Sequence, residues 1–284
     1  MSTLSLKNPH SVLAVLKVRP RDVIEIRVSS AREARESRDS EGRRDYWSEV
    51  LTLARKEGIR VTTAPRPQKA GPIRGDRHEG AQERMDDGRA STTEAIVRER
   101  QPLPLEQVLP QKGEQEGQGL WLALDQLQDP HNVGSVFRTA AFFGVRGIVM
   151  TLDRSAALTS TVYDVASGGM EDVPFTIVPN LQRAFEVSKD RGLWILGTSE
   201  NARQSWNTVP KDRNWLLVLG NEEKGMRRLT GEACDMVCQI PPAGKGVGSL
   251  NVSVAAGILI SKLARFASGH PGGSARRADL LRAG

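Results

Sequence analysis

An arginine among apolar residues makes the segment from Asn132 to Thr139 the first candidate for chemistry. The pattern predicts a helix that opens at Asn132 and carries Arg138 about one and a half turns from its start. A guanidinium stays positively charged and donates hydrogen bonds in a rigid fork, so it can stabilise developing negative charge. Taken alone, an arginine in such a helix is more often an ordinary surface residue, so the segment needs support from elsewhere in the chain.

Two glycine-rich segments later in the chain also suit a ligand. Residues 220–226 read GNEEKGM, so glycines at both ends let backbone amides approach a ligand while Glu222 orients polar groups. A tight turn between a strand and a helix explains the same residues equally well. Residues 240–253 form a glycine-rich loop that leads into a helix capped by Ser249 or Asn251. This loop lacks the residues of the nucleotide-triphosphatase and dinucleotide motifs, which leaves a backbone that can wrap a flat, polar ligand.

The elements that must position these segments alternate between apolar runs and helical patterns after residue 119. This order predicts an α/β fold with a mainly parallel sheet and covering helices. Strands are predicted at residues 120–124, 147–150, 174–178, 193–197, 215–220 and 236–240. Helices are predicted from Asn132, near Thr161, from Leu181 and from Asn251. Parallel sheets bind ligands at the carboxyl ends of their strands, so we expect the site there.

The first hundred residues predict a separate small α/β unit. Its helices are expected at residues 11–17 and 46–57 and its strands at 23–28 and 59–63. A proline-rich stretch follows, in which apolar residues near Leu105 predict a short docked helix. We therefore predict four parts: a first domain at 1–100, a linker at 101–118, a second domain at 119–268 and a flexible basic tail at 269–284.

The charge balance suits a polyanionic partner. The formal net charge is +6, and the first hundred residues hold 21 lysines and arginines against 16 aspartates and glutamates. An excess of this size is compatible with RNA, DNA or an acidic membrane surface. We therefore expect the first domain to be the polyanion binder.

Cysteine content and hydropathy limit the remaining classes. Cys234 and Cys238 are four residues apart without a histidine nearby, which is too few ligands for zinc, so we expect structural thiols and no metal. No apolar run reaches the roughly 18 residues of a membrane span, and the N-terminus does not read as a secretory signal. The sequence therefore predicts a cytoplasmic protein.

Taken together, the three segments resemble the three motifs of the SpoU (TrmH-type) branch of the SPOUT RNA methyltransferases. Residues 132–140 (NVGSVFRTA) are similar to the first motif, residues 219–226 (LGNEEKGM) to the second and residues 249–256 (SLNVSVAA) to the third. Their order and spacing agree with the family across residues 119–267. The resemblance implies the SPOUT fold, with a deep trefoil knot at the carboxyl edge of the sheet.

The same resemblance implies a cofactor and an assembly. S-adenosylmethionine is expected to be held by the backbone at Gly220, Ile240 and Leu250, and a homodimer is expected to form each site from two chains. The reaction requires no metal. The residues that the resemblance assigns to catalysis are Asn132, Arg138, Glu222, Ser249 and Asn251.

The first domain resembles, more loosely, the ribosomal-protein-L30e-like domain of members that methylate large-subunit ribosomal RNA. The supporting residues are 8–16, 53–59 and 77–80. Residues 81–93 depart from the pattern, because they separate His78 from the strand that follows it directly in relatives. The loop at residues 243–248 is also one glycine longer than usual. These departures leave open the role of His78 and the cofactor contacts of that loop.

We predict from these motifs that the chain is an enzyme for 2′-O-ribose methylation of RNA, with a guanosine of 23S-type ribosomal RNA as the leading target. A transfer RNA guanosine and a non-catalytic ribosome assembly factor are the alternatives. Arg138 either takes the proton of the ribose hydroxyl or stabilises the forming alkoxide. Because arginine keeps its proton in proteins, stabilisation is the favoured role. The other four residues then position Arg138, the ribose and its phosphate.

Overall fold

The structure is a computed structural model that describes residues 2–29, 45–64, 93–111 and 119–264. The chain divides into two compact units, Met1–Glu99 and Arg100–Gly284. The predictions for His78, for most of the 81–93 insertion, for the end of the linker and for the tail lie outside the described residues.

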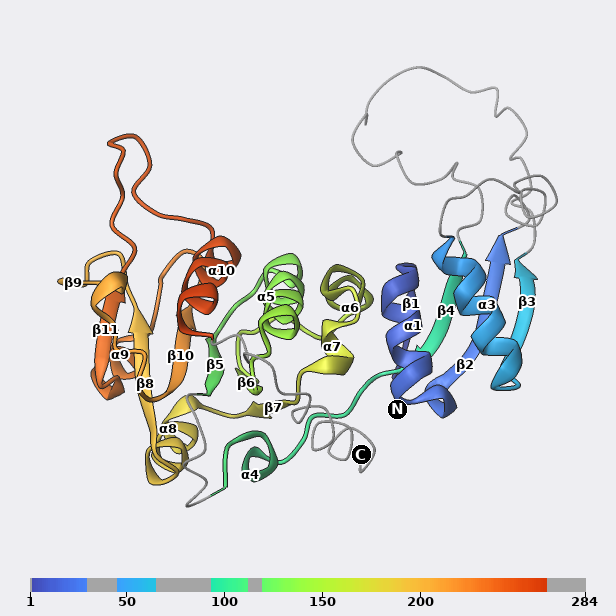
Figure 1. The fold of residues 1–284 in the computed structure, drawn as a ribbon, viewed down its shortest axis with the longest axis horizontal. Helices are drawn as coiled ribbons and strands as arrows, with labels where there is room; N and C mark the ends of the chain where they lie inside the picture. The colour runs from blue at the N-terminus through green and yellow to red at the C-terminus, as the bar shows by residue number, and fades with distance from the viewer. Residues whose placement is uncertain (1, 30–44, 65–92, 112–118, 265–284) are drawn as a thin grey trace, which may run out of the picture. The chain divides into compact units, whose positions relative to one another are not determined.

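The first unit is a four-stranded mixed sheet with two helices that pack against each other (Figure 1). The strand order is β1-β4-β2-β3, in which β2 and β3 are parallel and β4 is antiparallel to both of its neighbours. Its elements are β1 (Thr3–Leu6), α1 (Pro9–Val18), η1 (Pro20–Asp22), β2 (Val23–Ser29), α3 (Tyr46–Lys56), β3 (Arg60–Ala64) and β4 (Glu94–Arg98). Asn8 and Asp45 start the two helices, because each side chain accepts a backbone N–H two residues on.

The second unit contains, in its described part, a seven-stranded sheet in the order β7-β6-β5-β10-β8-β11-β9, with every pair parallel. Its strands are β5 (Leu120–Asp125), β6 (Gly147–Thr151), β7 (Phe175–Val178), β8 (Leu193–Thr198), β9 (Gln204–Ser205), β10 (Asn214–Gly220) and β11 (Met236–Gln239). Its helices are α4 (Leu105–Val108), α5 (Pro130–Phe143), α6 (Ser160–Ala166), α7 (Gly169–Asp172), α8 (Leu181–Asp190), η2 (Trp206–Thr208), α9 (Arg228–Ala233) and α10 (Val252–Leu263).

This sheet confirms the predicted α/β class with a parallel arrangement. The unbroken apolar strands β5 and β10 pair along their full lengths at its centre, and both are buried throughout most of their length. The L30e-like assignment of the first unit and the trefoil knot stay predictions.

Helix α5 begins two residues earlier than predicted. Its N-cap is Asp129, whose side chain accepts the N–H of His131 at 2.9 Å, and Pro130 occupies the first helical position. Proline fits there because the first turn of a helix leaves its N–H groups without intrahelical partners. The helix ends at Gly144, which adopts the left-handed conformation with φ +72°.

The described residues before β5 belong to the second unit from Arg100 on, and they pack on the rest of that unit. Helix α4 lies there, and Val108 accepts the indole N–H of Trp121 at 2.8 Å. The backbone N–H of Arg100 donates to the Tyr163 hydroxyl at 3.0 Å, and its guanidinium donates to the carbonyl of Val173 at 3.0 Å. These contacts fix residues 100–109 against the sheet that carries the site.

Strands β5 and β10 are neighbours in the sheet, and the chain turns in opposite directions after them. From β5 the chain continues to β6 on one side, whereas from β10 it continues through α9 to β11 on the other side. Such a divergence places the loops that follow the two strands side by side at the carboxyl edge of the sheet. The loops after β5 and β10 are the first two candidate segments, so the topology brings them together.

Packing between α5 and α6 generates a test of this architecture. A Cβ atom at Gly134 would lie 2.7 Å from the Cβ of Val165 and 2.8 Å from the carbonyl oxygen of Val162. Gly134→Ala therefore has to separate the two helices, and we expect the free energy of unfolding in urea to fall by about 1–3 kcal/mol. The control is Gly231→Ala in α9, where the nearest atom lies 4.0 Å away and stability should stay constant or rise slightly. Equal stability of the two variants would contradict the close contact.

Candidate active site

Residues 220–227, here called the glycine loop, form a closed structure after β10. Asn221 and Gly225 exchange two backbone hydrogen bonds of 3.0 and 2.9 Å, and the Asn221 side-chain oxygen accepts two further N–H groups inside the loop. A Cβ atom at Gly220 would lie 2.3 Å from the backbone nitrogen of Met226, so only glycine fits where the loop closes on itself. The loop is therefore preformed by its own hydrogen bonds.

The carboxylate of Glu222 attaches the glycine loop to the start of α5. One oxygen accepts the backbone N–H of Asp129 and the side-chain amide of Asn132, each at 3.2 Å. The other oxygen accepts the backbone N–H of Gln128 at 3.2 Å and the side-chain amide of Asn221 at 3.3 Å. A carboxylate at a helix N-terminus is favoured by the helix dipole and by unpaired N–H groups. Because its two oxygens already accept these four hydrogen bonds, Glu222 acts as a positioning group.

A second side-chain contact attaches the third segment to the first. The Asn251 amide donates to the side-chain oxygen of Asn132 at 3.0 Å. The Asn251 oxygen in turn accepts the backbone N–H of Ser253 at 2.8 Å, so Asn251 is the N-cap of α10. The Asn251 amide therefore donates to Asn132, and the Asn132 amide donates to Glu222. These two hydrogen bonds fix the orientation of both side-chain amides. The three motifs meet in one hydrogen-bonded network.

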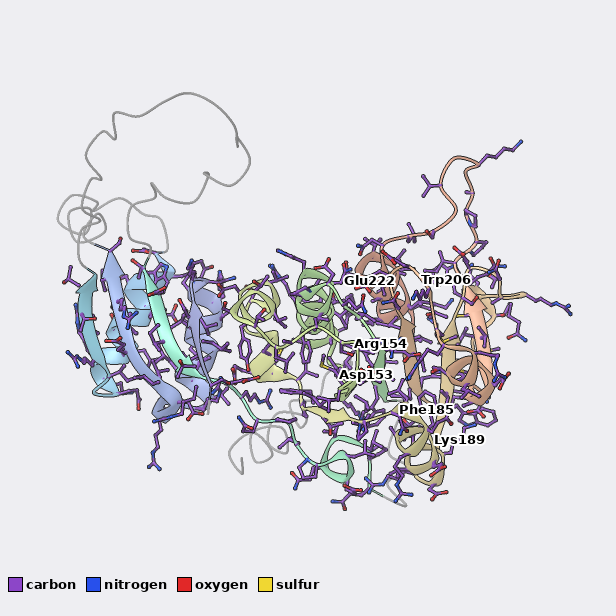
Figure 2. The ribbon with its side chains drawn as sticks, turned by 180° about the vertical axis from the view of Figure 1, so that it is seen from behind. Asp153, Arg154, Phe185, Lys189, Trp206 and Glu222 are labelled. Atoms are coloured by element: carbon purple, nitrogen blue, oxygen red, sulfur yellow. The ribbon has the colours of Figure 1, made fainter. Side chains whose placement is uncertain are left out.

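A cavity of about 1240 Å³ opens beside this network. It lies at the carboxyl ends of β8, β10 and β11, between the glycine loop and the loop that precedes α10. In Figure 2, Glu222 lies toward this end of the sheet, whereas Phe185 and Lys189 of α8 lie toward the other end. Six of the eight predicted site residues line the cavity: Gly220, Glu222, Ile240, Ser249, Leu250 and Asn251. Asn132 is buried and contacts two of them.

Arg138 lies apart from the cavity within one chain. Its side chain is exposed on α5, it is absent from the cavity lining, and it has no hydrogen-bond partner among the residues that the structure describes. The helical period explains this position, because His131, Arg138 and Phe142 share the outward face of α5 while Phe137 and Ala140 face the core. A single chain therefore does not assemble the predicted site completely.

Residues 240–250, here called the 240–250 loop, project from the sheet between β11 and α10 (Figure 1). Residues 241–250 are exposed, and most of them line the cavity. Each backbone N–H and C=O group is a strong donor or acceptor, so this exposed backbone can exchange water for a polar ligand.

The structure adds a buried ion pair that the motif comparison did not identify. Asp125, the last residue of β5, has a fully buried side chain and contacts Arg227 at the end of the glycine loop. The two residues are 102 positions apart. A charged residue that ends an otherwise apolar strand is the signal that could have identified Asp125, but its partner depends on the pairing of β5 with β10.

The thiols of Cys234 and Cys238 both have raised pKa values. Burial raises the pKa of the Cys238 thiol to about 11, and burial with the nearby charge of Asp235 raises the pKa of the Cys234 thiol to about 12. Both thiols therefore stay protonated at neutral pH. Within the described residues, no group of three or more His, Cys, Asp or Glu side chains could hold a metal ion. In the same residues, no helix is long and apolar enough to cross a membrane.

The fold is that of an α/β protein with a cavity at the carboxyl edge of a parallel sheet, which is where such folds bind their ligands. Residues 119–261 match the model of the SpoU rRNA Methylase family. The 23S rRNA (guanosine-2′-O-)-methyltransferase RlmB of Bordetella pertussis is 35% identical over 269 residues, which cover 94% of this chain and 99% of that protein. The protein of the same name from Pseudomonas aeruginosa is 36% identical over 263 residues, or 90% and 94% of the two chains.

Solved structures agree with this result at the level of the fold. The SpoU methyltransferase AviRb from Streptomyces viridochromogenes, crystallised with AdoMet, has a TM-score of 0.67 and 18% sequence identity, over 92% of this chain and 89% of that one. The chain belongs to the SpoU rRNA methylase family. This confirms the family resemblance of the three motifs.

The raised pKa values of the thiols give a test of the cavity wall, because Cys238 lines it. An unperturbed thiol has a pKa of about 8.5 and reacts readily with iodoacetamide at pH 8. We expect alkylation of native protein at pH 8 to be at least about tenfold slower than in denaturant, with Cys238→Ser used to follow Cys234 alone. Rapid modification of the native protein at either site would show that the thiols are open to solvent.

Proposed function

We propose that this chain transfers the methyl group of S-adenosylmethionine to a ribose 2′-hydroxyl of RNA, and that its target is a guanosine of large-subunit ribosomal RNA. The observation that carries the proposal is the network from Glu222 through Asn132 to Asn251, which joins all three motifs beside one cavity. The 23S rRNA enzymes that match almost the whole chain support ribosomal RNA over transfer RNA. This target also implies a cytoplasmic location.

The cavity fits the cofactor by the chemistry of its lining. The glycine loop presents backbone at Gly220, while the 240–250 loop presents exposed backbone beside the cavity. Backbone donors and acceptors suit the adenine edge and ribose of S-adenosylmethionine, and the glycines of the 240–250 loop let the chain approach closely. When bound, the cofactor supplies a methyl group on a sulfonium. The trefoil knot that the resemblance implies would hold both loops at this edge.

The protein's own residues have to hold the ribose and manage its proton. Glu222 and the two asparagines fix the wall of the site, and Ser249 and Asn251 offer hydrogen bonds to the ribose or its phosphate at the start of α10. In our proposal Arg138 stabilises the negative charge that develops on the 2′-oxygen. Because Arg138 is exposed on α5 and does not line the cavity of its own chain, we propose that it serves the cavity of a second chain.

A homodimer follows from this division, and the surface beside Arg138 supports it. Helices α5 and α10 pack side by side (Figure 1) and expose large apolar side chains. Phe142 of α5 is 80% exposed, Val254 of α10 is 50% exposed and Leu250 is 46% exposed. Exposed large apolar side chains on α5, on α10 and directly before α10 support a protein contact. A second copy placed there would cover them and bring its arginine to the site.

The first unit is proposed to select the RNA, as an L30e-like domain with most of the chain's excess positive charge. Lysine and arginine contacts to phosphates release counterions, so the affinity for RNA should fall steeply with salt. A looped rather than fully paired target is expected, because only unstacked nucleotides can present a 2′-hydroxyl to a deep cavity.

The role of Arg138 can be tested with Arg138→Ala. Loss of a charge stabiliser should lower methyl transfer from tritiated S-adenosylmethionine by about a hundredfold to a thousandfold, while cofactor binding in calorimetry stays nearly unchanged. Arg183→Ala, which removes an exposed arginine from α8, is the matched control and should keep full activity. Normal transfer by Arg138→Ala would remove Arg138 from the reaction.

The dimer can be tested by placing a charge on its proposed face. Phe142→Glu buries a carboxylate between the two copies, so we expect sedimentation velocity to show a shift from dimer to monomer. Leu229→Glu is the control, because Leu229 is also exposed but lies on α9, and that variant should stay dimeric. A dimeric Phe142→Glu protein would place the interface elsewhere.

A further inference from the structure

Arg227 is held by one carboxylate along one edge of its guanidinium. Its Nε and Nη2 groups lie 2.8 and 2.7 Å from one oxygen of Asp125, and its backbone N–H donates to the other oxygen at 3.2 Å. Within the described residues, the Nη1 group of Arg227 has no hydrogen-bond partner. Two donors on this second edge are therefore free to bind an acceptor.

The position of Asp125 makes this arrangement rigid. Its side chain is fully buried at the end of β5, where it pairs in register with Gly220 at the start of the glycine loop. A buried carboxylate needs a charged partner, and Arg227 supplies one through both side chain and backbone. The guanidinium is thus held at a fixed point while its side chain stays 42% exposed toward the cavity that Arg227 lines.

The other cations of the cavity lining lack this restraint. Lys224 is exposed on the glycine loop, and Arg228 is 77% exposed and pairs with the exposed Glu232 on the surface of α9. Long exposed side chains lose conformational freedom when they bind, whereas a guanidinium that is already fixed does not. Arg227 is therefore the best prepared of these three cations to bind an anion.

We propose that Arg227, aimed by Asp125, is the oxyanion-binding residue of the cavity. Its ligand is either the carboxylate at the methionine end of the cofactor or a phosphate of the RNA, since both are oxyanions that accept the paired donors of arginine. Asp125 acts as a positioning residue. This inference rests on the proposed function, because it takes the ligands of the cavity to be S-adenosylmethionine and RNA.

The test compares two ligands that differ in the carboxylate. S-adenosylhomocysteine carries the amino acid group, whereas 5′-methylthioadenosine has the same adenosine and sulfur without it. In calorimetry with the full-length protein, we expect Arg227→Met to weaken S-adenosylhomocysteine by about tenfold to a hundredfold and to leave 5′-methylthioadenosine unchanged if the anion is the cofactor carboxylate. The unchanged ligand also verifies that the cavity is still folded.

A second experiment measures the binding of a 23S rRNA fragment by Arg227→Met at several salt concentrations. If the anion is a phosphate, S-adenosylhomocysteine affinity stays constant, RNA affinity falls, and the slope of log affinity against log salt decreases by about one. Asp125→Asn should give the same pattern with a smaller loss, and the double variant should equal Arg227→Met because the two residues act as a unit. Glu232→Gln removes the neighbouring surface pair and should change nothing.

Two results would overturn the inference. One is equal weakening of both adenosine ligands by Arg227→Met, which would mean that the arginine only supports the loop. The other is no change in either ligand or in the RNA salt slope. If the unmodified protein binds neither adenosine ligand, the proposed function fails and this inference fails with it. If the unmodified protein binds these ligands and only the expected effects of the variants are missing, the proposed function stands and this inference fails.

Discussion

The site depends on one carboxylate placed at the start of one helix. Glu222 accepts two backbone N–H groups that precede α5 and two side-chain amides, so it connects the loop after β10 to the loop after β5. Glu222 is itself exposed, and water could replace part of these bonds. Its main contribution is therefore the geometry of the loops rather than the stability of the fold. Without this contact, the Asn132 amide, whose oxygen accepts the Asn251 amide, would lose the acceptor that orients it.

The two loops around the cavity differ in how much they are fixed. The glycine loop is closed by its own hydrogen bonds and attached through Glu222, Asn221 and Arg227 to residues 125–132. The 240–250 loop is followed by Asn251, which contacts Asn132, and its own backbone is exposed. A preformed wall lowers the entropy cost of binding, whereas the exposed backbone supplies contacts that a ligand completes. Both features suit a cofactor that is held mainly by backbone.

The sequence predicted the strands of the second sheet well, because parallel strands buried on both faces read as apolar runs. It did not identify β9, which has two residues, or β1, which alternates weakly at the edge of the first sheet. The start of α5 was placed at Asn132 because the apolar pattern begins there, but the cap is Asp129. Local capping chemistry decides a helix start more strongly than periodicity does.

The site was predictable in its residues and only partly in its geometry. Motif similarity predicted Gly220, Ile240 and Leu250 as site residues, and all three line the cavity. It could not show that Arg138 faces away from the cavity of its own chain, because the outward face of α5 depends on how that helix packs. The pairing of Asp125 with Arg227 was hidden for a similar reason. It requires the register of β5 against β10, which no local pattern encodes.

The central claim is that this protein places a methyl group on a ribose of ribosomal RNA. The most direct measurement maps 2′-O-methylated nucleotides in ribosomal and transfer RNA from cells with and without the gene. We expect one guanosine of large-subunit ribosomal RNA to lose its methyl group in the deletion strain and to regain it when the gene returns. Identical 2′-O-methylation of both RNA classes in the two strains would contradict this function.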